Sequence, residues 1–477
     1  MLEYDLVVIG SGPAGQKAAI QAAKLGRRVC VAEAREVVGG AAVNTGTIPS
    51  KALREAILRY AGREGASPRI ADFAAAAAAG PGKPGLLAGL WSSCQEVIKD
   101  EISIVRGHFH SNRIDLVTGR AQFRDANIID VVGPHASTAI RGEKILIGVG
   151  TSPAKPAEVP FGENDVITSD ELLTLHRLPH SMIVVGGGVI GTEYTSMLAA
   201  LGVKVTLVEG RSRLLDFVDA EIIEALQYHL RQAGVTLRLG EKVVSIRKVA
   251  PPPGARATNE FMAEATLESG KTLRADCLLY CIGRQGATDA LNLGAAGLKA
   301  DKRGRIDVNQ FGQTEVPHIY AAGDVVGFPA LASTSMEQGR LAACHMFGAA
   351  TEPVPELLPY GIYAIPEISM VGWTEEHLTR EGVPYEAGIA SYREIARGQL
   401  LGDEIGMLKL LIHQESHAIL GVHVIGTGAT ELVHIGQAAI AFKATVEYFI
   451  NAVFNYPTLA ECYKVAALNG LNKLRHV

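Results

Sequence analysis

The sequence predicts an α/β protein with two Rossmann-like units and an α+β region at its C-terminal end. Two observations lead to this fold class. An apolar strand that opens into G-x-G-x-x-G and a helical stretch occurs twice, at residues 4–25 and 182–201, and the composition changes after about residue 351. The 477 residues, 48% apolar and 20% charged, allow roughly two to four domains of a globular enzyme.

The first unit begins with an apolar strand that ends at the glycine turn Gly10-x-Gly12-x-x-Gly15. A helical stretch and a second apolar run follow, and the second run ends on Glu33. The three glycines permit a tight turn, the approach of a pyrophosphate and close packing of helix on strand. The helix N-terminus attracts the diphosphate, and Glu33 would accept a hydrogen bond from a ribose hydroxyl. The alternative is a tight turn without a ligand, but the strand, helix and acid together favour a nucleotide site.

The second unit repeats this pattern with Gly186, Gly188 and Gly191 after an apolar strand, and with Glu209 at the end of the next strand. Two dinucleotide folds in one chain suggest two dinucleotides, and hence electron transfer between cofactors.

The segments between and after these units are expected to be as follows: a glycine-containing loop at 37–51 that leads into a helix from about residue 50, a low-complexity excursion at 62–85, a helix at 86–107, a strand at 144–148, a hairpin tip at 250–254, and strands at 278–282 and 318–321 that run into Gly283 and into Gly323-Asp324. After about residue 351, strand-like runs at 408–413 and 420–425 and helices at 430–442 and 459–475 indicate an α+β domain.

Composition argues against several function classes. A net charge of −5 and a pI near 6.3 give no basic surface for nucleic acid or an acidic membrane. The sequence contains neither an apolar run of membrane-span length nor a signal peptide, so we expect a cytoplasmic protein. The six cysteines show no C-x-x-C pair and no metal-ligand spacing, so we expect all six to be reduced and mostly buried, with no metal site.

Together these motifs resemble the flavoprotein disulfide reductases, the family of dihydrolipoamide dehydrogenase and glutathione reductase. The resemblance spans the whole chain, and it implies a FAD-binding domain at 1–155 and 284–350, a NAD(P)-binding domain at 156–283 and a dimerisation domain at 351–477. It implies that FAD is bound by Gly10, Gly12, Gly15, Glu33, Gly46, Thr47, Lys51, Gly150, Gly323 and Asp324. It implies that NAD(P) is bound by Gly186, Gly188, Gly191, Glu209, Arg211, Arg213 and Gly283. A homodimer or a larger homo-oligomer follows from the same resemblance.

The departures from the family pattern concern thiol chemistry. Ala42 and Thr47 stand where the family has its two redox cysteines, and Tyr456 stands where it has the histidine base, while Glu461 remains. The stretches 46–54 and 454–458 resemble the soluble, FAD-containing pyridine nucleotide transhydrogenases, a branch of this family. Those proteins commonly keep one cysteine at the position of Ala42. Because this chain has alanine there, a thiol is not expected to take part.

Lys51 and Glu193 are the candidate catalytic pair, because the family places such a lysine and glutamate beside flavin N5. There the lysine would stabilise negative charge on the reduced flavin, and the glutamate would fix the lysine. The alternatives are a solvated lysine at a helix start and a first-turn carboxylate that the helix dipole favours. Tyr456 and Glu461 are further candidates, although a simpler interpretation makes Tyr456 a packing residue at the flavin and Glu461 a structural acid.

The residues at and after the end of the second unit's second strand bear on nucleotide preference. Glu209 suits an unphosphorylated ribose, whereas Arg211 and Arg213 could attract a 2′-phosphate. Both together fit an enzyme that takes both nucleotides, and two solvated loop arginines are the alternative. We therefore expect hydride transfer between NADPH and NAD⁺ by a ping-pong cycle through FAD. Two alternatives are a NAD(P)H-dependent flavin reductase of quinones, dyes or oxygen, and a catalytically silent dinucleotide-binding protein.

Overall fold

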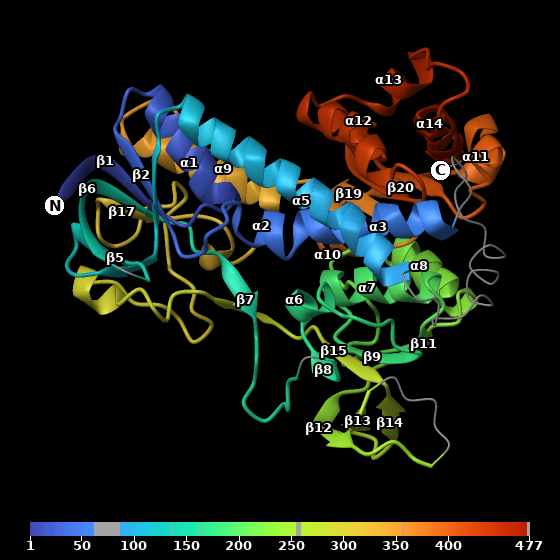
Figure 1. Ribbon diagram of the computed structural model, residues 1–477. Helices are drawn as coiled ribbons and strands as arrows, with labels where there is room; N and C mark the ends of the chain where they lie inside the picture. Colours follow the sequence, from blue (N-terminus) through green and yellow to red (C-terminus); the bar gives the residue numbers. More distant parts are fainter. Residues whose placement is uncertain (62–85, 135, 163, 254–258, 356, 475–477) are drawn as a thin grey trace. The chain divides into compact units, whose positions relative to one another are not determined.

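The computed structural model describes residues 1–61, 86–134, 136–162, 164–253, 259–355 and 357–474 (Figure 1). It divides into two compact units. The first comprises Met1–Leu53, Trp91–Ala154 and Gly283–Glu356, and the second comprises Arg54–Leu90, Lys155–Ile282 and Leu357–Val477. The expected excursion at 62–85 lies outside the described residues, as does much of the connection between the strands that flank 250–261.

The first unit is built on a seven-stranded mixed sheet with the order β3-β2-β1-β6-β5-β4, in which β17 also pairs with β6. Strands β1, β2, β3, β6 and β17 are parallel, and β4 and β5 continue the sheet antiparallel. The strand bounds are β1 Leu2–Ile9, β2 Val29–Glu33, β3 Asp115–Thr118, β4 Arg120–Phe123, β5 Ile128–Val132, β6 Ser137–Ile147 and β17 Ile319–Ala321. Two short strands, β7 Thr151–Pro153 and β16 Arg284–Gly286, pair separately.

Both faces of this sheet bury apolar side chains, and helices cover one of the two faces. Leu6 and Val8 of β1 pack with α1, α5 and α9, whereas Val7 and Ile9 pack into a second core on the opposite face. The helices that begin in or belong to this unit are α1 Pro13–Lys24, α2 Gly40–Asn44, α3 Thr47–Ala61, α5 Leu86–Ser111, α9 Ala332–Met346 and the 3₁₀ turns η1 Leu293–Ala296 and η2 Asp324–Val326. Helices α1 and α9 touch closely, since a Cβ at Gly339 would lie 2.0 Å from the carbonyl oxygen of Ala14.

The second unit contains an all-parallel five-stranded sheet with the order β11-β10-β9-β15-β8. Its elements are β8 Val166–Ile167, α6 Ser169–Leu172, β9 Ser181–Val185, α7 Val189–Ala200, β10 Lys204–Glu209, α8 Ala220–Gln232, β11 Thr236–Leu239 and β15 Cys277–Tyr280. An antiparallel sheet of β12 Val243–Val249, β13 Met262–Leu267 and β14 Thr272–Ala275 is inserted before β15. This parallel sheet places the second glycine turn at the carboxyl end of β9.

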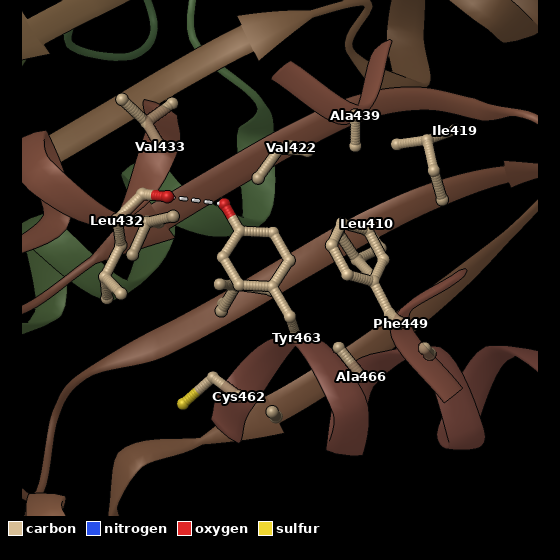
Figure 2. Close-up of a cluster of buried hydrophobic side chains, with 14 of the residues drawn as sticks. Leu410, Ile419, Val422, Leu432, Val433, Ala439, Phe449, Cys462, Tyr463 and Ala466 are labelled. Carbon is tan, nitrogen blue, oxygen red and sulfur yellow. Dashed lines mark hydrogen bonds between the residues drawn. The ribbon is translucent and has the colours of Figure 1, made fainter. Parts of the chain in front are cut away.

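The same unit ends in an antiparallel sheet with the order β18-β19-β22-β21-β20. Its elements are β18 Tyr360–Ile362, β19 Ile368–Gly372, α10 Glu375–Arg380, β20 Tyr385–Ser391, η3 Tyr392–Glu394, α11 Ala396–Leu401, β21 Met407–His413, β22 Ile419–Ile425, α12 Ala429–Ala441, α13 Val446–Asn451 and α14 Glu461–Leu474. Figure 2 shows the core beneath the helices, where the buried Tyr463 hydroxyl donates to the carbonyl oxygen of Leu432 at 2.6 Å. That bond satisfies the polar end of a ring whose body fills the apolar core.

Several expectations from the sequence need correction. The segment 37–51 is not simply a loop, because it holds α2 and the start of α3, which begins at Thr47 rather than near Ser50. Helix α5 runs to Ser111, beyond the expected end at 107.

The six cysteines are free, and five of them are buried, as expected, with Cys281 half-buried. Among the described residues, no helix has both the length and the apolar character that a membrane crossing requires.

Candidate active site

The first glycine turn joins β1 to α1 and has the geometry of a phosphate cradle. Gly10 has φ +100°, and a Cβ there would lie 2.5 Å from the carbonyl oxygen of Gly148. A Cβ at Gly15 would lie 2.0 Å from the carbonyl oxygen of Gly10, so helix and strand could not pack as they do. A Cβ at Gly12 meets only the Gly40 Cα, at 3.9 Å. The middle glycine therefore leaves room beside the α1 N-terminus, as a diphosphate requires.

Glu33, at the end of β2, is hydrogen-bonded to this turn. One carboxylate oxygen accepts hydrogen bonds from the backbone N–H of Ser11 at 2.9 Å and from its hydroxyl at 2.6 Å. The other oxygen accepts from the backbone N–H of Arg35 at 3.0 Å. Ser11 in turn accepts from the N–H of Gly39 at 2.9 Å, which ties the α2 loop to the turn. The carboxylate is thus fixed at the strand end, where a ribose hydroxyl would meet it.

The second turn repeats the first almost atom for atom. Gly186 has φ +109°, a Cβ at Gly191 would lie 1.9 Å from the Gly186 carbonyl oxygen, and a Cβ at Gly188 would meet nothing within 4 Å. Glu209 accepts from the N–H of Gly187 at 2.6 Å, in the place that Glu33 takes in the first unit. The residues of both turns therefore fit a bound dinucleotide, and each unit carries one such turn.

Arg211 is exposed but ion-paired, because its guanidinium is bound to Glu209. Its backbone N–H and Nε reach one carboxylate oxygen at 2.8 and 3.0 Å, and its Nη2 reaches the other at 3.0 Å. Nη1 also donates to Asp216 at 2.6 Å. Burial raises the pKa of Glu209, but the hydrogen bonds from Arg211 and Gly187 outweigh it and hold that pKa below its ordinary value. The acid and the arginine form one charged group at the strand end.

Arg213 is also engaged, with a partner far along the chain. Its Nη1 donates to the Glu376 carboxylate at 2.7 Å, and its Nη2 donates to the carbonyl oxygen of Asp216 at 2.8 Å. About a third of its side chain, 30%, remains exposed. Both arginines are therefore ion-paired, although 44% of the Arg211 side chain and 30% of the Arg213 side chain remain exposed.

Asp324 lies at the start of η2, and its carboxylate accepts from the Thr151 hydroxyl at 3.1 Å. Arg284 donates to the same hydroxyl at 2.7 Å and to the Thr151 carbonyl at 2.8 Å. Gly323, which precedes the acid with φ +85°, donates its N–H to Gln338 at 2.8 Å. This network holds a carboxylate at the end of β17, on the same sheet as the first glycine turn.

Three predicted cofactor-site glycines occupy connections. Gly46 lies between α2 and α3, and a Cβ there would lie 3.1 Å from the Ala41 carbonyl oxygen. Gly150, with φ +65°, follows β6 and has nothing within 4 Å of an added Cβ. Gly283, which we assigned to the NAD(P) site, accepts from the Ala154 N–H at 3.2 Å and is grouped with the first unit.

The α2–α3 segment holds the two positions at which the family has its redox cysteines. Ala42 lies within α2, and Thr47 is the exposed first residue of α3. Neither carries sulfur. Lys51 follows in the first turns of α3, half-buried, with Nζ 3.3 Å from the Ser50 hydroxyl oxygen. The helix therefore presents a cation, not a thiol, at this end.

Glu193 differs from the simple alternative that we considered for it. It is the fifth residue of α7, outside the first turn, and its side chain is buried at 3% exposure. One carboxylate oxygen accepts the backbone N–H of Tyr363 at 2.8 Å. A first-turn carboxylate held by the helix dipole is thus the wrong description, and a buried, oriented carboxylate is the right one.

Tyr456 and Glu461 lie before and at the start of α14. Tyr456 is 75% exposed in this chain, and Glu461 accepts from the N–H of Thr458 at 3.3 Å. That hydrogen bond ties the Glu461 side chain to the turn that precedes α14, which is a structural role.

Sequence reasoning missed a set of residues around the segment 363–367. Arg54 donates to the Ala364 carbonyl at 3.0 Å and forms an ion pair with Glu367 at 3.2 Å, with both side chains 8% exposed. The N–H of Ile365 donates to the Ser196 hydroxyl at 3.0 Å, next to the contact of Tyr363 with Glu193. These bonds tie β18–β19 to α3 and α7. Only Glu367 carried a signal in the sequence, as a charged residue between apolar neighbours.

Comparison with known proteins agrees with this geometry. Residues 4–339 match the family model described as pyridine nucleotide-disulphide oxidoreductase, and residues 358–467 match that family's dimerisation-domain model. The chain belongs to the pyridine nucleotide-disulphide oxidoreductase family. It is therefore a flavoprotein oxidoreductase with FAD as its cofactor and pyridine nucleotides as its substrates.

Individual relatives narrow the comparison. A Mycobacterium bovis protein named soluble pyridine nucleotide transhydrogenase is 51% identical over 100% of this chain and 98% of its own length. A Marinomonas protein of the same name is 44% identical over 99% of both chains. Among solved structures, the HOCl-induced flavoprotein disulfide reductase RclA from Escherichia coli aligns with a TM-score of 0.84 at 26% identity, over 98% of this chain and 100% of that one.

Proposed function

We propose that this protein is a soluble pyridine nucleotide transhydrogenase that moves hydride between NADPH and NAD⁺. The observation that carries the proposal is the combination of two intact dinucleotide turns with the loss of both redox sulfurs at Ala42 and Thr47. The full-length similarity to proteins named for this activity supports it. Bound FAD would accept a hydride from one nicotinamide and return it to another, so one nicotinamide site suffices.

The protein's own contribution is to bind, to orient and to supply charge. Gly12 and Glu33 hold one dinucleotide, and Gly188 and Glu209 hold the other. Lys51 supplies a positive charge that would stabilise the negative charge on the reduced flavin. Glu193 is the expected partner that fixes this lysine, and its own carboxylate is oriented by the Tyr363 N–H at 2.8 Å.

The same proposal includes a cytoplasmic homodimer. The match to the dimerisation-domain model supports the dimer, and the absence of a membrane-length helix among the described residues is consistent with the location. No nucleic-acid partner is expected, given the net charge of −5.

Stopped-flow measurement of the Lys51→Met variant tests the catalytic assignment. Methionine keeps most of the bulk and removes the charge, so FAD content should survive. Loss of one preorganised charge typically costs about 3 kcal/mol in the transition state, a hundredfold or more in rate. The loss should appear both in flavin reduction by NADPH and in reoxidation by NAD⁺.

Glu193→Gln should give a related but smaller defect, because it displaces the lysine without removing it. Arg59→Met is a matched control, since it removes a positive charge from the last turn of the same helix. Near-wild-type rates in both half-reactions of a FAD-loaded Lys51→Met protein would show that Lys51 is only a helix-start lysine.

A further inference from the structure

Glu376 is a carboxylate from helix α10 that reaches the predicted 2′-phosphate region of the nucleotide-binding fold. One of its oxygens accepts from Arg213 Nη1 at 2.7 Å and from the backbone N–H of Ala220 at 3.0 Å. Ala220 is the first residue of α8, and Asp219 is its N-cap. The acid is therefore anchored by a helix N-terminus while it holds the arginine.

The loop that carries Arg213 packs against the second glycine turn. The Leu215 N–H donates to the Gly187 carbonyl oxygen at 3.3 Å, and the N–H of that glycine donates to Glu209. A Cβ on Gly187 would lie 2.5 Å from the Leu214 side chain. Arg213 therefore directly precedes Leu214 and Leu215, the two residues that contact the second glycine turn, and 30% of its side chain remains exposed.

Arg213 and Arg211 differ in what restrains them. Arg211 is bound to Glu209 and Asp216, both on its own strand end and loop, and 44% of its side chain is exposed. Arg213 is held by an acid 163 residues away whose own position is fixed by α8. Burial raises the pKa of Glu376, but the bond from Arg213 and other local bonds leave that pKa below its ordinary value. Glu376 is therefore an anion at neutral pH and competes with any other anion for this guanidinium.

We propose that Glu376 is a specificity-determining residue that weakens binding of 2′-phosphorylated nucleotides by competing with the phosphate for Arg213. A 2′-phosphate carries a charge between −1 and −2 near neutral pH, so it must draw the guanidinium from the carboxylate and also tolerate that carboxylate nearby. A ribose without a 2′-phosphate does not compete for the guanidinium and brings no negative charge near the carboxylate.

This competition suits a site that alternates between two nucleotides. If Arg213 were unopposed, NADP(H) would hold the single site more tightly and slow its exchange for NAD(H). The inference rests on the proposed function only for the identity of the two nucleotides, because the competition itself is a property of binding.

The test is isothermal titration of the FAD-loaded protein with adenosine 2′,5′-bisphosphate and with 5′-AMP, which need no turnover. Glu376→Gln keeps the size of the side chain and an oxygen that can accept from Ala220, but removes the charge. It should tighten binding of the bisphosphate about three- to tenfold and leave binding of 5′-AMP within about twofold. Glu381→Gln is the matched control, because Glu381 is the C-cap of the same helix and pairs with Arg380 instead.

A second background separates competition for Arg213 from simple repulsion. In Arg213→Ala protein the bisphosphate should bind more weakly, and adding Glu376→Gln should give little further change. Any of four results would overturn the proposal. Glu376→Gln could tighten binding of both ligands equally, tighten binding of the bisphosphate to the same extent without Arg213, or not tighten it at all, or the wild-type protein could fail to bind the bisphosphate. Failure of the proposed function would appear separately, as bound nucleotides without hydride exchange.

Discussion

Lys409 is buried in β21 among carboxylates, and replacing it with methionine gives a sharp prediction. Its side chain is 0% exposed, and its ammonium lies 2.9 Å from both Asp219 and Glu221 and also contacts Glu375. Asp219 is 1% exposed, whereas 44% of the Glu221 side chain and 34% of the Glu375 side chain are exposed. Without the lysine, the two glutamates can turn toward water, but Asp219 cannot.

The magnitude follows from that asymmetry. Breaking a buried pair leaves an uncompensated charge and typically costs about 3–5 kcal/mol. Lys409→Met should therefore lower the free energy of unfolding by about that amount. Lys473→Met is the matched control, because Lys473 is 44% exposed and lies 3.7 Å from Glu386. An exposed pair of this kind contributes about 0–1 kcal/mol.

The loss should depend on pH in a defined direction. Burial raises the pKa of Asp219, but neighbouring His423 and Lys409 outweigh it and depress that pKa, so its stabilisation is present above about pH 4 and lost as the pH falls through the folded value. Burial lowers the pKa of Lys409, but Glu375 and Asp219 outweigh it and raise that pKa, so its stabilisation is present below about pH 10 and lost above the folded value. The gap between wild type and Lys409→Met should be full from about pH 5 to 9 and should narrow as the pH falls below about 4.

Urea unfolding of the FAD-loaded proteins, followed by circular dichroism, measures the difference. The same denaturant slope with a lower midpoint indicates lost stability without a change in compactness. A loss below about 1 kcal/mol, equal to that of Lys473→Met and flat with pH, would refute the reasoning that Asp219 depends on this lysine.

The remaining predictions concern binding and chemistry. Gly191→Ala places a Cβ 1.9 Å from a backbone carbonyl oxygen of its turn, so we expect NAD(P)H binding to weaken by about 1–3 kcal/mol in titrations while FAD content stays unchanged. Because Ala42 and Thr47 carry no sulfur, coupled assays should detect no reduction of dihydrolipoamide, glutathione disulfide or mercuric ion at enzymatic rates; turnover comparable to nicotinamide oxidation and dependent on FAD would contradict this. Replacing both Arg211 and Arg213 with alanine should raise the KM for NADPH more than about tenfold and leave the KM for NADH nearly unchanged, and equal effects would mean that the arginines do not discriminate.

Local patterns in the sequence predicted the elements that hold the dinucleotides. The roles of Gly10 and Gly15, and of their counterparts Gly186 and Gly191, follow from a spacing that only one strand–turn–helix geometry satisfies. The two long C-terminal helices were also predicted within a few residues of α12 and α14, because their apolar spacing is helical.

Contacts between distant segments could not be predicted in this way. The bond between Arg213 and Glu376 joins residues 163 positions apart, and neither position is unusual in its local sequence. The Tyr363 N–H that orients Glu193 is a backbone group, so it leaves no trace in residue identity. Lys409 did carry a signal, as one charge inside an apolar strand, but its three carboxylate partners come from two other elements.

Anaerobic reduction of the purified flavoprotein by NADPH, followed by addition of NAD⁺, tests the central claim most directly. The account predicts that the flavin absorbance band is bleached by NADPH and returns on addition of NAD⁺, with NADH formed in equal amount. Persistent bleaching after NAD⁺, with recovery only on adding a quinone or oxygen, would contradict it and favour a flavin reductase. A band that NADPH fails to bleach would instead indicate a catalytically silent dinucleotide-binding protein.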